Sequence, residues 1–166
     1  MISVTGAITF RDTILAVHIA AVLIGFGIIF AYPLIFGRAR RRDPRALPAL
    51  HRLRGDIELR LMTPGLVVIL LAGIYLASSE HEFKSFFVQW GFGAVVVLGG
   101  LIGAYFAPRE RRLAQLAQRD VDASGDGELT LGPEYAALYR QVAMVTGLAS
   151  LLVLLTVFFM ATHAGH

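Results

Sequence analysis

Four long uncharged stretches dominate the pattern of hydrophobic and polar positions along the chain. They cover residues 13–37, 61–79, 86–108 and 141–162. An α-helix of about 20 apolar residues crosses the roughly 30 Å hydrocarbon core of a bilayer. Hydrocarbon offers no partners for open backbone groups, so stretches this apolar must be helical there. The pattern therefore predicts an all-α, polytopic membrane four-helix bundle that forms a single domain over residues 1–166.

The arginines are unevenly distributed among the segments that connect these stretches. Residues 38–60 contain eight arginines and residues 109–140 contain five, which together are 13 of the 15 basic residues. Loops rich in arginine and lysine tend to stay in the cytoplasm. We therefore expect both segments to be cytoplasmic loops, with the N-terminus and the C-terminus on the outer (periplasmic or extracellular) side of the cell's inner (plasma) membrane.

The composition narrows the function classes. Hydrophobic residues make up 56% of the chain and charged residues 16%, with a net charge of +3. Because the basic residues lie beside apolar stretches, they indicate membrane topology and no nucleic-acid partner. The absence of cysteine excludes disulfides and thiolate metal sites. No Asp or Glu lies within any of the four stretches, which argues against a proton-driven transporter.

Small residues recur at every fourth position of the third stretch, at Gly99, Gly103 and Ala107. Such rows let helix backbones approach closely. They predict helix–helix seams, either within the bundle, in a homo-oligomer or against a membrane-protein partner.

The arginine-rich segment 38–60 has the spacing of an amphipathic helix. We expect this helix to lie along the lipid headgroups, with its arginines in contact with anionic lipids. Its apolar side would consist of Leu47, Leu50, Leu53 and Ile57.

His18 is the most unusual residue of the first stretch, because it lies about a turn and a half inside the outer end. A polar side chain at that depth needs a partner or a function. It is either a neutral imidazole bonded to a neighbouring helix or a ligand. The topology places His81 and His163 on the same outer face, where imidazoles from different helices could together bind a metal or a haem.

The start of the second stretch also allows two interpretations. Thr63 is placed to cap the helix, and Glu58 can pair locally with Arg60, which would make the segment structural. Alternatively, Arg60 points into the bundle and binds an anionic group such as a propionate or a phosphate.

Residues 122–130 follow the first nine positions of an EF-hand calcium loop. Asp122, Ser124 and Asp126 take the oxygen-ligand positions one, three and five, and a glycine takes position six. Position twelve, which should be a bidentate glutamate, is Pro133. The segment is therefore either a calcium site with a ligand missing or an acidic turn at a loop tip, and Pro133 favours the turn.

Several of these segments together resemble a bacterial family of small four-helix integral membrane proteins of uncharacterised function. The resemblance rests on the following segments: Ala-Val-His-Ile-Ala at 16–20, Arg-Leu-Met-Thr-Pro-Gly at 60–65, Ala-Gly-Ile-Tyr-Leu at 72–76 and Pro-Arg-Glu-Arg-Arg-Leu at 108–113.

More distantly, the first two stretches are similar to the membrane-bound, oxygen-independent protoporphyrinogen oxidase of bacteria (the HemJ type). This resemblance implies haem b as a cofactor, with His18 as a ligand and Arg60 in contact with a propionate or the substrate. The oxidase has a lysine early in its third helix, whereas residues 87–91 here read Phe-Val-Gln-Trp-Gly. The resemblance therefore implies haem binding more than the oxidase reaction.

Three function classes follow. The first is a haem- or metal-binding membrane protein of the redox type, centred on His18. The second is a non-enzymatic accessory or structural subunit of a membrane complex, and the third is a small oligomeric transporter.

Overall fold

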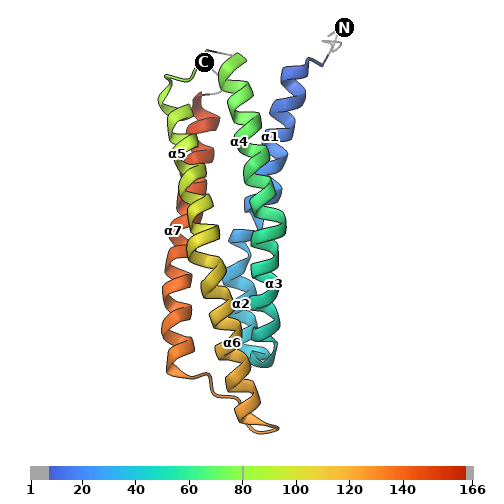
Figure 1. The fold of residues 1–166 in the computed structure, drawn as a ribbon, viewed down its shortest axis with the longest axis vertical. Helices are drawn as coiled ribbons and strands as arrows, with labels where there is room; N and C mark the ends of the chain where they lie inside the picture. Colours follow the sequence, from blue (N-terminus) through green and yellow to red (C-terminus); the bar gives the residue numbers. More distant parts are fainter. Residues whose placement is uncertain (1–7, 80, 164–166) are drawn as a thin grey trace.

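The computed structural model describes residues 8–79 and 81–163, which form four antiparallel helical columns (Figure 1). The first column consists of α1 (Phe10–Gly27), the 3-10 segment η1 (Ile28–Phe30) and α2 (Tyr32–Arg42). The second consists of η2 (Pro44–Ala46), α3 (Leu47–Ile57), the π-helical segment η3 (Glu58–Met62) and α4 (Thr63–Ser79). The third consists of α5 (Phe86–Gly100), the π-helical segment η4 (Leu101–Phe106) and α6 (Ala107–Ser124). The fourth is the single helix α7 (Pro133–His163).

All four columns are suited to a bilayer. The described residues contain four helices that are long and apolar enough to cross a membrane, with lengths of 33, 36, 39 and 30 residues. At about 1.5 Å per residue, even the shortest is longer than the roughly 30 Å hydrocarbon core. The structure thus confirms the prediction of an all-α chain with four long apolar helices, and it extends each column beyond the predicted stretch.

The segments predicted as inner loops are mostly helical. The first column continues to Arg42, the second begins at Pro44, and the third continues to Ser124. The prediction of a separate helix along the lipid headgroups was wrong, because α3 continues into α4 and packs along α6. Its predicted apolar side is only partly covered by protein: Leu47 of α3 packs into the bundle with Leu113 of α6, both fully buried, whereas Leu53 is exposed.

The molecule has two halves that pack differently. In the terminal half, where the first column begins and the last ends, α1 packs along α4 and α5 along α7 (Figure 1). In the arginine half, α3 packs along α6, and α2 and the first part of α7 complete the bundle. In α1 the buried residues are Gly25 and Phe26, whereas in α6, of equal length, they are Ala107, Glu110, Leu113, Ala114, Leu116 and Ala117.

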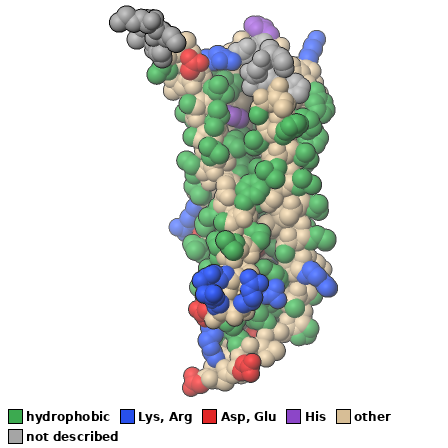
Figure 2. Space-filling model, turned by 180° about the vertical axis from the view of Figure 1, so that it is seen from behind, with side chains coloured by type: hydrophobic (Ala, Val, Ile, Leu, Met, Phe, Trp, Pro, Cys, Tyr) green, Lys and Arg blue, Asp and Glu red, His purple; other side chains and the backbone are tan. Residues whose placement is uncertain are grey.

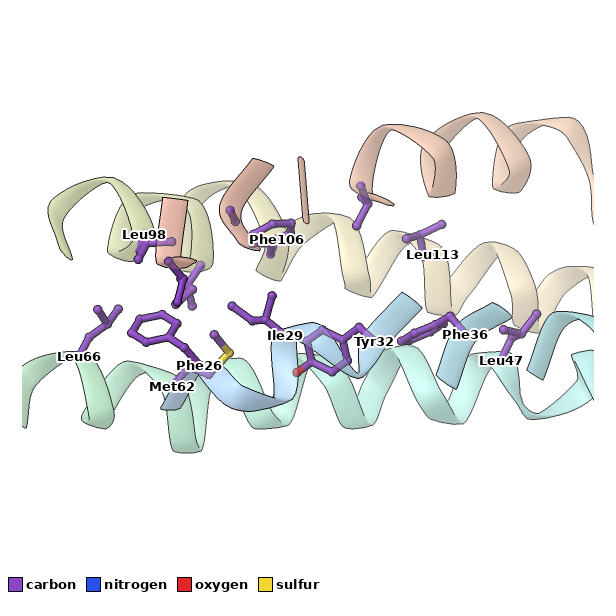
Figure 3. Close-up of a cluster of buried hydrophobic side chains, with 14 of the residues drawn as sticks. Phe26, Ile29, Tyr32, Phe36, Leu47, Met62, Leu66, Leu98, Phe106 and Leu113 are labelled. Atoms are coloured by element: carbon purple, nitrogen blue, oxygen red, sulfur yellow. The ribbon is translucent and has the colours of Figure 1, made fainter. Parts of the chain in front are cut away.

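The buried apolar core begins where the two halves meet and continues into the arginine half. Figure 3 shows Phe26 and Leu66 at one end of this core and Phe36 and Leu47 at the other, with all their side chains directed between the columns. The buried polar side chains of the arginine half lie beside this core: His51, Arg54, Glu58, Glu110 and Thr146.

The small-residue seams are less continuous than the sequence predicts. A Cβ on Gly99 would meet the Leu66 side chain at 3.8 Å, whereas one on Gly103 would meet nothing within 4 Å. Another close backbone approach joins the first two columns, where a Cβ on Gly65 would lie 3.7 Å from the Gly25 Cα. Glycines on both helices allow this approach, because neither has a side chain to separate the backbones.

Candidate functional site

Four ionisable side chains are buried together in the arginine half. His51 and Arg54 lie on α3, Glu58 on η3 and Glu110 on α6, and the most exposed of them, Arg54, retains 6% of its accessible surface. We call these residues, with the polar neighbours that they contact, the buried cluster. Those neighbours are Tyr32, Tyr135 and Thr146.

Arg54 is the centre of the buried cluster. Its Nε donates to Glu58 Oε1 at 2.9 Å, and its Nη2 donates to Thr146 Oγ1 at 3.0 Å. Its Nη1 lies 3.1 Å from Glu110 Oε1 in an ion pair. The guanidinium also lies over the Tyr32 ring, 4.5 Å from its centroid. Each of the three guanidinium nitrogens therefore lies near an oxygen. These oxygens belong to the second column, which also carries Arg54, and to the third and fourth columns.

His51 connects Glu110 to the fourth column. Its Nδ1 lies 2.6 Å from Glu110 Oε2, and its Nε2 lies 2.9 Å from the Tyr135 hydroxyl. The Phe36 ring covers the imidazole, with the ring centroids 4.7 Å apart. Both ring nitrogens are thus engaged within the protein, so His51 has no nitrogen free to bind a metal.

Within the described residues, three buried oxygens of the buried cluster have no hydrogen-bond partner. One is Glu110 Oε1, which is in the ion pair with Arg54. The other two are Glu58 Oε2 and the Tyr32 hydroxyl. Both residues line a cavity of about 10 Å³, which Arg54 and Thr146 also line. A cavity of this size is near the smallest that holds one water molecule. Tyr32 and Glu58, which carry these two oxygens, therefore line a space close to the size of a single water.

The π-helical segment η3 places Glu58 in the interior. Thr63 Oγ donates to the Glu58 carbonyl at 2.9 Å, five residues back along the chain. π-helical turns of this kind are frequent at functional sites. The helix runs through this point, so Thr63 does not begin it, and the prediction that Thr63 is an N-cap was wrong.

Sequence reasoning missed the buried cluster. It considered a local pair of Glu58 with Arg60. It also argued against a proton-driven transporter, because the predicted spans contain no acidic residue. Instead, Glu58 pairs with Arg54, and both Glu58 and Glu110 are buried inside the bundle. The objection to a proton-coupled function therefore no longer holds.

A signal for the buried cluster was present in the spacing of the second column. The buried positions recur at intervals of three and four residues, which is the spacing of one helix face. They are Leu47, His51, Arg54, Glu58 and Met62. The prediction placed the buried face of the helix on the leucine positions and did not count polar residues as buried. One of those leucines, Leu53, is exposed.

Arg60 lies on the outside of the bundle. Its side chain is 84% exposed, and its Nε lies 3.8 Å from Asp56 Oδ1. The alternative in which Arg60 points into the bundle does not hold in this structure.

His18 is half-buried between the first two columns, in the terminal half. Its Nδ1 lies 3.1 Å from the Ile69 carbonyl oxygen on α4. The ring packs beside Gly73, where a Cβ would lie 3.6 Å from His18 Cε1. A carbonyl oxygen can only accept, so Nδ1 carries a proton, and in the neutral imidazole Nε2 then keeps its lone pair.

The predicted metal ligands whose side chains the structure describes are not gathered into a group of three or more. Within the described residues, no group of three or more His, Asp or Glu side chains is placed to hold a metal ion. His81 lies in the turn after α4, with a φ of 58°. The side chain of His163 lies outside the described residues, so the three-histidine site with His18 stays a prediction.

The EF-hand-like segment is helical where a calcium loop would begin. α6 continues to Ser124, and Asp122 accepts a hydrogen bond from Gln118 at 2.9 Å. Ser124 Oγ donates to the Val121 carbonyl at 2.8 Å.

The positively charged side chain of Arg45 already binds the tip of this segment. The Arg45 guanidinium donates to the carbonyl oxygens of Gly125 and Gly127 at 2.8 and 2.9 Å. Asp126 is exposed beside it. The structure thus favours the acidic turn over the calcium loop.

No family model, curated protein or solved structure matches this chain. Its function must therefore be inferred from His18 and the buried cluster.

Proposed function

We propose that this chain is a haem-binding membrane protein of the redox type, in which His18 would hold the haem iron. The observation that carries the proposal is the hydrogen bond from His18 Nδ1 to the Ile69 carbonyl. Metal-ligating histidines usually donate their other ring N–H to a carbonyl, a carboxylate or a water, and this bond fixes the tautomer and the ring orientation. His18 has the same arrangement, with Nε2 left to bind iron.

The surroundings of His18 are compatible with a haem held through one imidazole. His18 is only half-buried, and one edge of its ring packs beside Gly73, which has no side chain. His51 cannot supply a second ligand, because Glu110 and Tyr135 engage both of its ring nitrogens. When bound, haem b would supply one-electron redox chemistry.

The contact of Arg60 with a haem propionate is not part of this proposal. Arg60 is exposed and lies nine residues from Ile69 on the same column, which is about 13 Å along a helix. The resemblance to the protoporphyrinogen oxidase supports haem binding through His18 alone.

The orientation in the membrane belongs to the same proposal. We infer that the arginine half faces the cytoplasm of a cell whose plasma membrane holds the chain, because basic residues favour that side. Figure 2 shows Lys and Arg side chains gathered in a band in that half. Exposed arginines of this band, such as Arg38, Arg41 and Arg42, are placed to contact anionic lipid headgroups.

The orientation can be tested with cysteine reporters, since the sequence contains no cysteine. Ser78 and Ala123 are exposed at opposite ends of the molecule. In intact cells, a membrane-impermeant maleimide should label Ser78→Cys and should label Ala123→Cys only after the membrane is opened. The reverse pattern would contradict the proposed orientation.

Haem binding is tested by the visible absorption spectrum of the full chain, expressed with haem in excess and purified in mild detergent. We expect a Soret band and, after reduction with dithionite, distinct α and β bands. The variant His18→Gly should lose these bands and regain them when free imidazole is added, while His81→Gly, in the turn after α4, should keep them.

Two results would overturn the proposal. A colourless wild-type protein would exclude haem and would favour an accessory subunit, which should instead co-purify with a membrane partner. Haem bands that survive unchanged in His18→Gly would show that His18 is a packing residue.

A further inference from the structure

The charges and hydrogen atoms of the buried cluster can be assigned by requiring a partner for each. The Tyr135 hydroxyl is fully buried, and the contact that the structure gives it is with His51 Nε2. Its hydrogen is satisfied only if Tyr135 donates and Nε2 accepts. His51 is then neutral, with its proton on Nδ1, from which it donates to Glu110 Oε2.

A neutral His51 leaves the buried cluster with one guanidinium and two carboxyl groups. If Glu58 and Glu110 were both ionised, Arg54 would balance one of them, and a net negative charge would remain buried. Arg40 lies over the neighbouring Tyr139 ring, but its own side chain is exposed, so water screens its charge. A buried charge without a partner costs several kcal/mol, and such groups take up a proton instead.

The contacts of the two carboxyl groups decide which of them carries the proton. Both oxygens of Glu110 lie near a positively polarised group. Oε2 is 2.6 Å from His51 Nδ1. Oε1 has no hydrogen bond within the described residues, but it is 3.1 Å from Arg54 Nη1 in an ion pair. In Glu58, Oε1 accepts from Arg54, whereas Oε2 has no partner among the described residues. An unpartnered oxygen is the natural position for an acid hydrogen, which can donate into the adjacent cavity.

The cavity beside Glu58 offers an acceptor for that hydrogen. It is also lined by Tyr32, whose hydroxyl has no partner among the described residues. Figure 3 shows the Tyr32 hydroxyl pointing toward the second column, which carries Glu58. The other elements around Glu58 contribute Arg54 from α3, Glu110 from α6 and, from α7, the uncharged Thr146.

We propose that the buried cluster is a proton-binding site, with Glu58 as a neutral carboxylic acid and one water in the cavity between Glu58 Oε2 and the Tyr32 hydroxyl. The site binds a proton and a water molecule as its ligands. It lies in the arginine half and does not depend on the haem proposed at His18, so either proposal can fail alone.

The test is infrared spectroscopy of the full chain at neutral pH in micelles of an alkyl glycoside detergent, which has no carbonyl group. A protonated carboxylic acid gives a carbonyl-stretching band that a carboxylate lacks, and the band shifts when the sample is equilibrated in D₂O. We expect this band in the wild type and in the control Glu134→Gln, which changes an exposed carboxylate. We expect its loss in Glu58→Gln, which resembles the neutral acid in shape and should fold.

A second variant tests the water-mediated contact without removing the acid. Tyr32→Phe keeps the ring under Arg54 but removes the hydroxyl, so the band should persist at a shifted frequency. An unshifted band would contradict the bridge to Tyr32. The absence of the band from the wild type, or its survival in Glu58→Gln, would overturn the proton site.

Discussion

The arginine half and the terminal half both place polar side chains among apolar ones, but they satisfy them differently. In the arginine half, every side-chain nitrogen of Arg54 and His51 lies near a partner, and all these partners except Glu58 belong to neighbouring columns. In the terminal half, His18 makes one bond, to the Ile69 carbonyl. A group whose atoms are all engaged holds helices together, whereas a group with a lone pair left over is available to a ligand.

The largest expected effect is on the counter-ion of the arginine half. Glu110→Ala removes the partner of His51 Nδ1 and one of the two carboxyl partners of the buried Arg54, which keeps Glu58. Breaking a buried pair in this way should lower the free energy of unfolding by about 3–5 kcal/mol. The measurement is reversible unfolding of the full chain in mixed detergent micelles, followed by circular dichroism.

The control for this variant is Glu134→Ala, whose ion pair with Arg119 is exposed. It should unfold as the wild type does, because water screens exposed pairs. Equal losses in the two variants would show that the buried cluster does not hold the arginine half together.

A smaller effect is expected where the buried cluster reaches α7. Tyr135→Phe keeps the aromatic ring but leaves His51 Nε2 buried without its donor. An unsatisfied buried polar atom costs about 1–3 kcal/mol in unfolding free energy. Tyr139→Phe, one turn further along α7, is the matched control, and a loss as large in the control would contradict the role assigned to Tyr135.

The smallest effect is expected at Arg60, the arginine outside the bundle. Arg60→Gln breaks an exposed pair with Asp56, which should change the unfolding free energy by less than about 0.5 kcal/mol. It should also leave haem occupancy unchanged. A marked loss of haem in this variant would restore the propionate contact that its exposed position argues against.

The sequence was sufficient to predict the four helices, because a lipid-facing helix must be apolar along its whole length. The sequence did not predict how far the helical columns continue beyond the four apolar stretches. The amphipathic pattern of α3 is the same whether its apolar side packs against lipid or against protein. α6 covers part of that side, and the predicted headgroup helix became part of the bundle.

The two sites differ in how far they could be predicted. The buried cluster could be read from the spacing of His51, Arg54 and Glu58, but a polar face is ordinarily assigned to water. His18 was predictable as a residue, since its depth in an uncharged stretch is visible in the sequence. The hydrogen-bond partner of His18 could not be predicted. It is the Ile69 carbonyl, and since every residue has a backbone carbonyl, no residue type marks this one in the sequence.

We assign stability of the fold to the buried cluster and haem binding to His18. The variant His18→Ala tests that division most directly. Haem occupancy and the unfolding free energy of the haem-free protein are measured on the same preparation and compared with Glu110→Ala. We predict that His18→Ala loses haem while its haem-free form unfolds within about 1 kcal/mol of the haem-free wild type, the loss of one hydrogen bond. Retained haem, or a loss of stability as large as that of Glu110→Ala, would contradict this account.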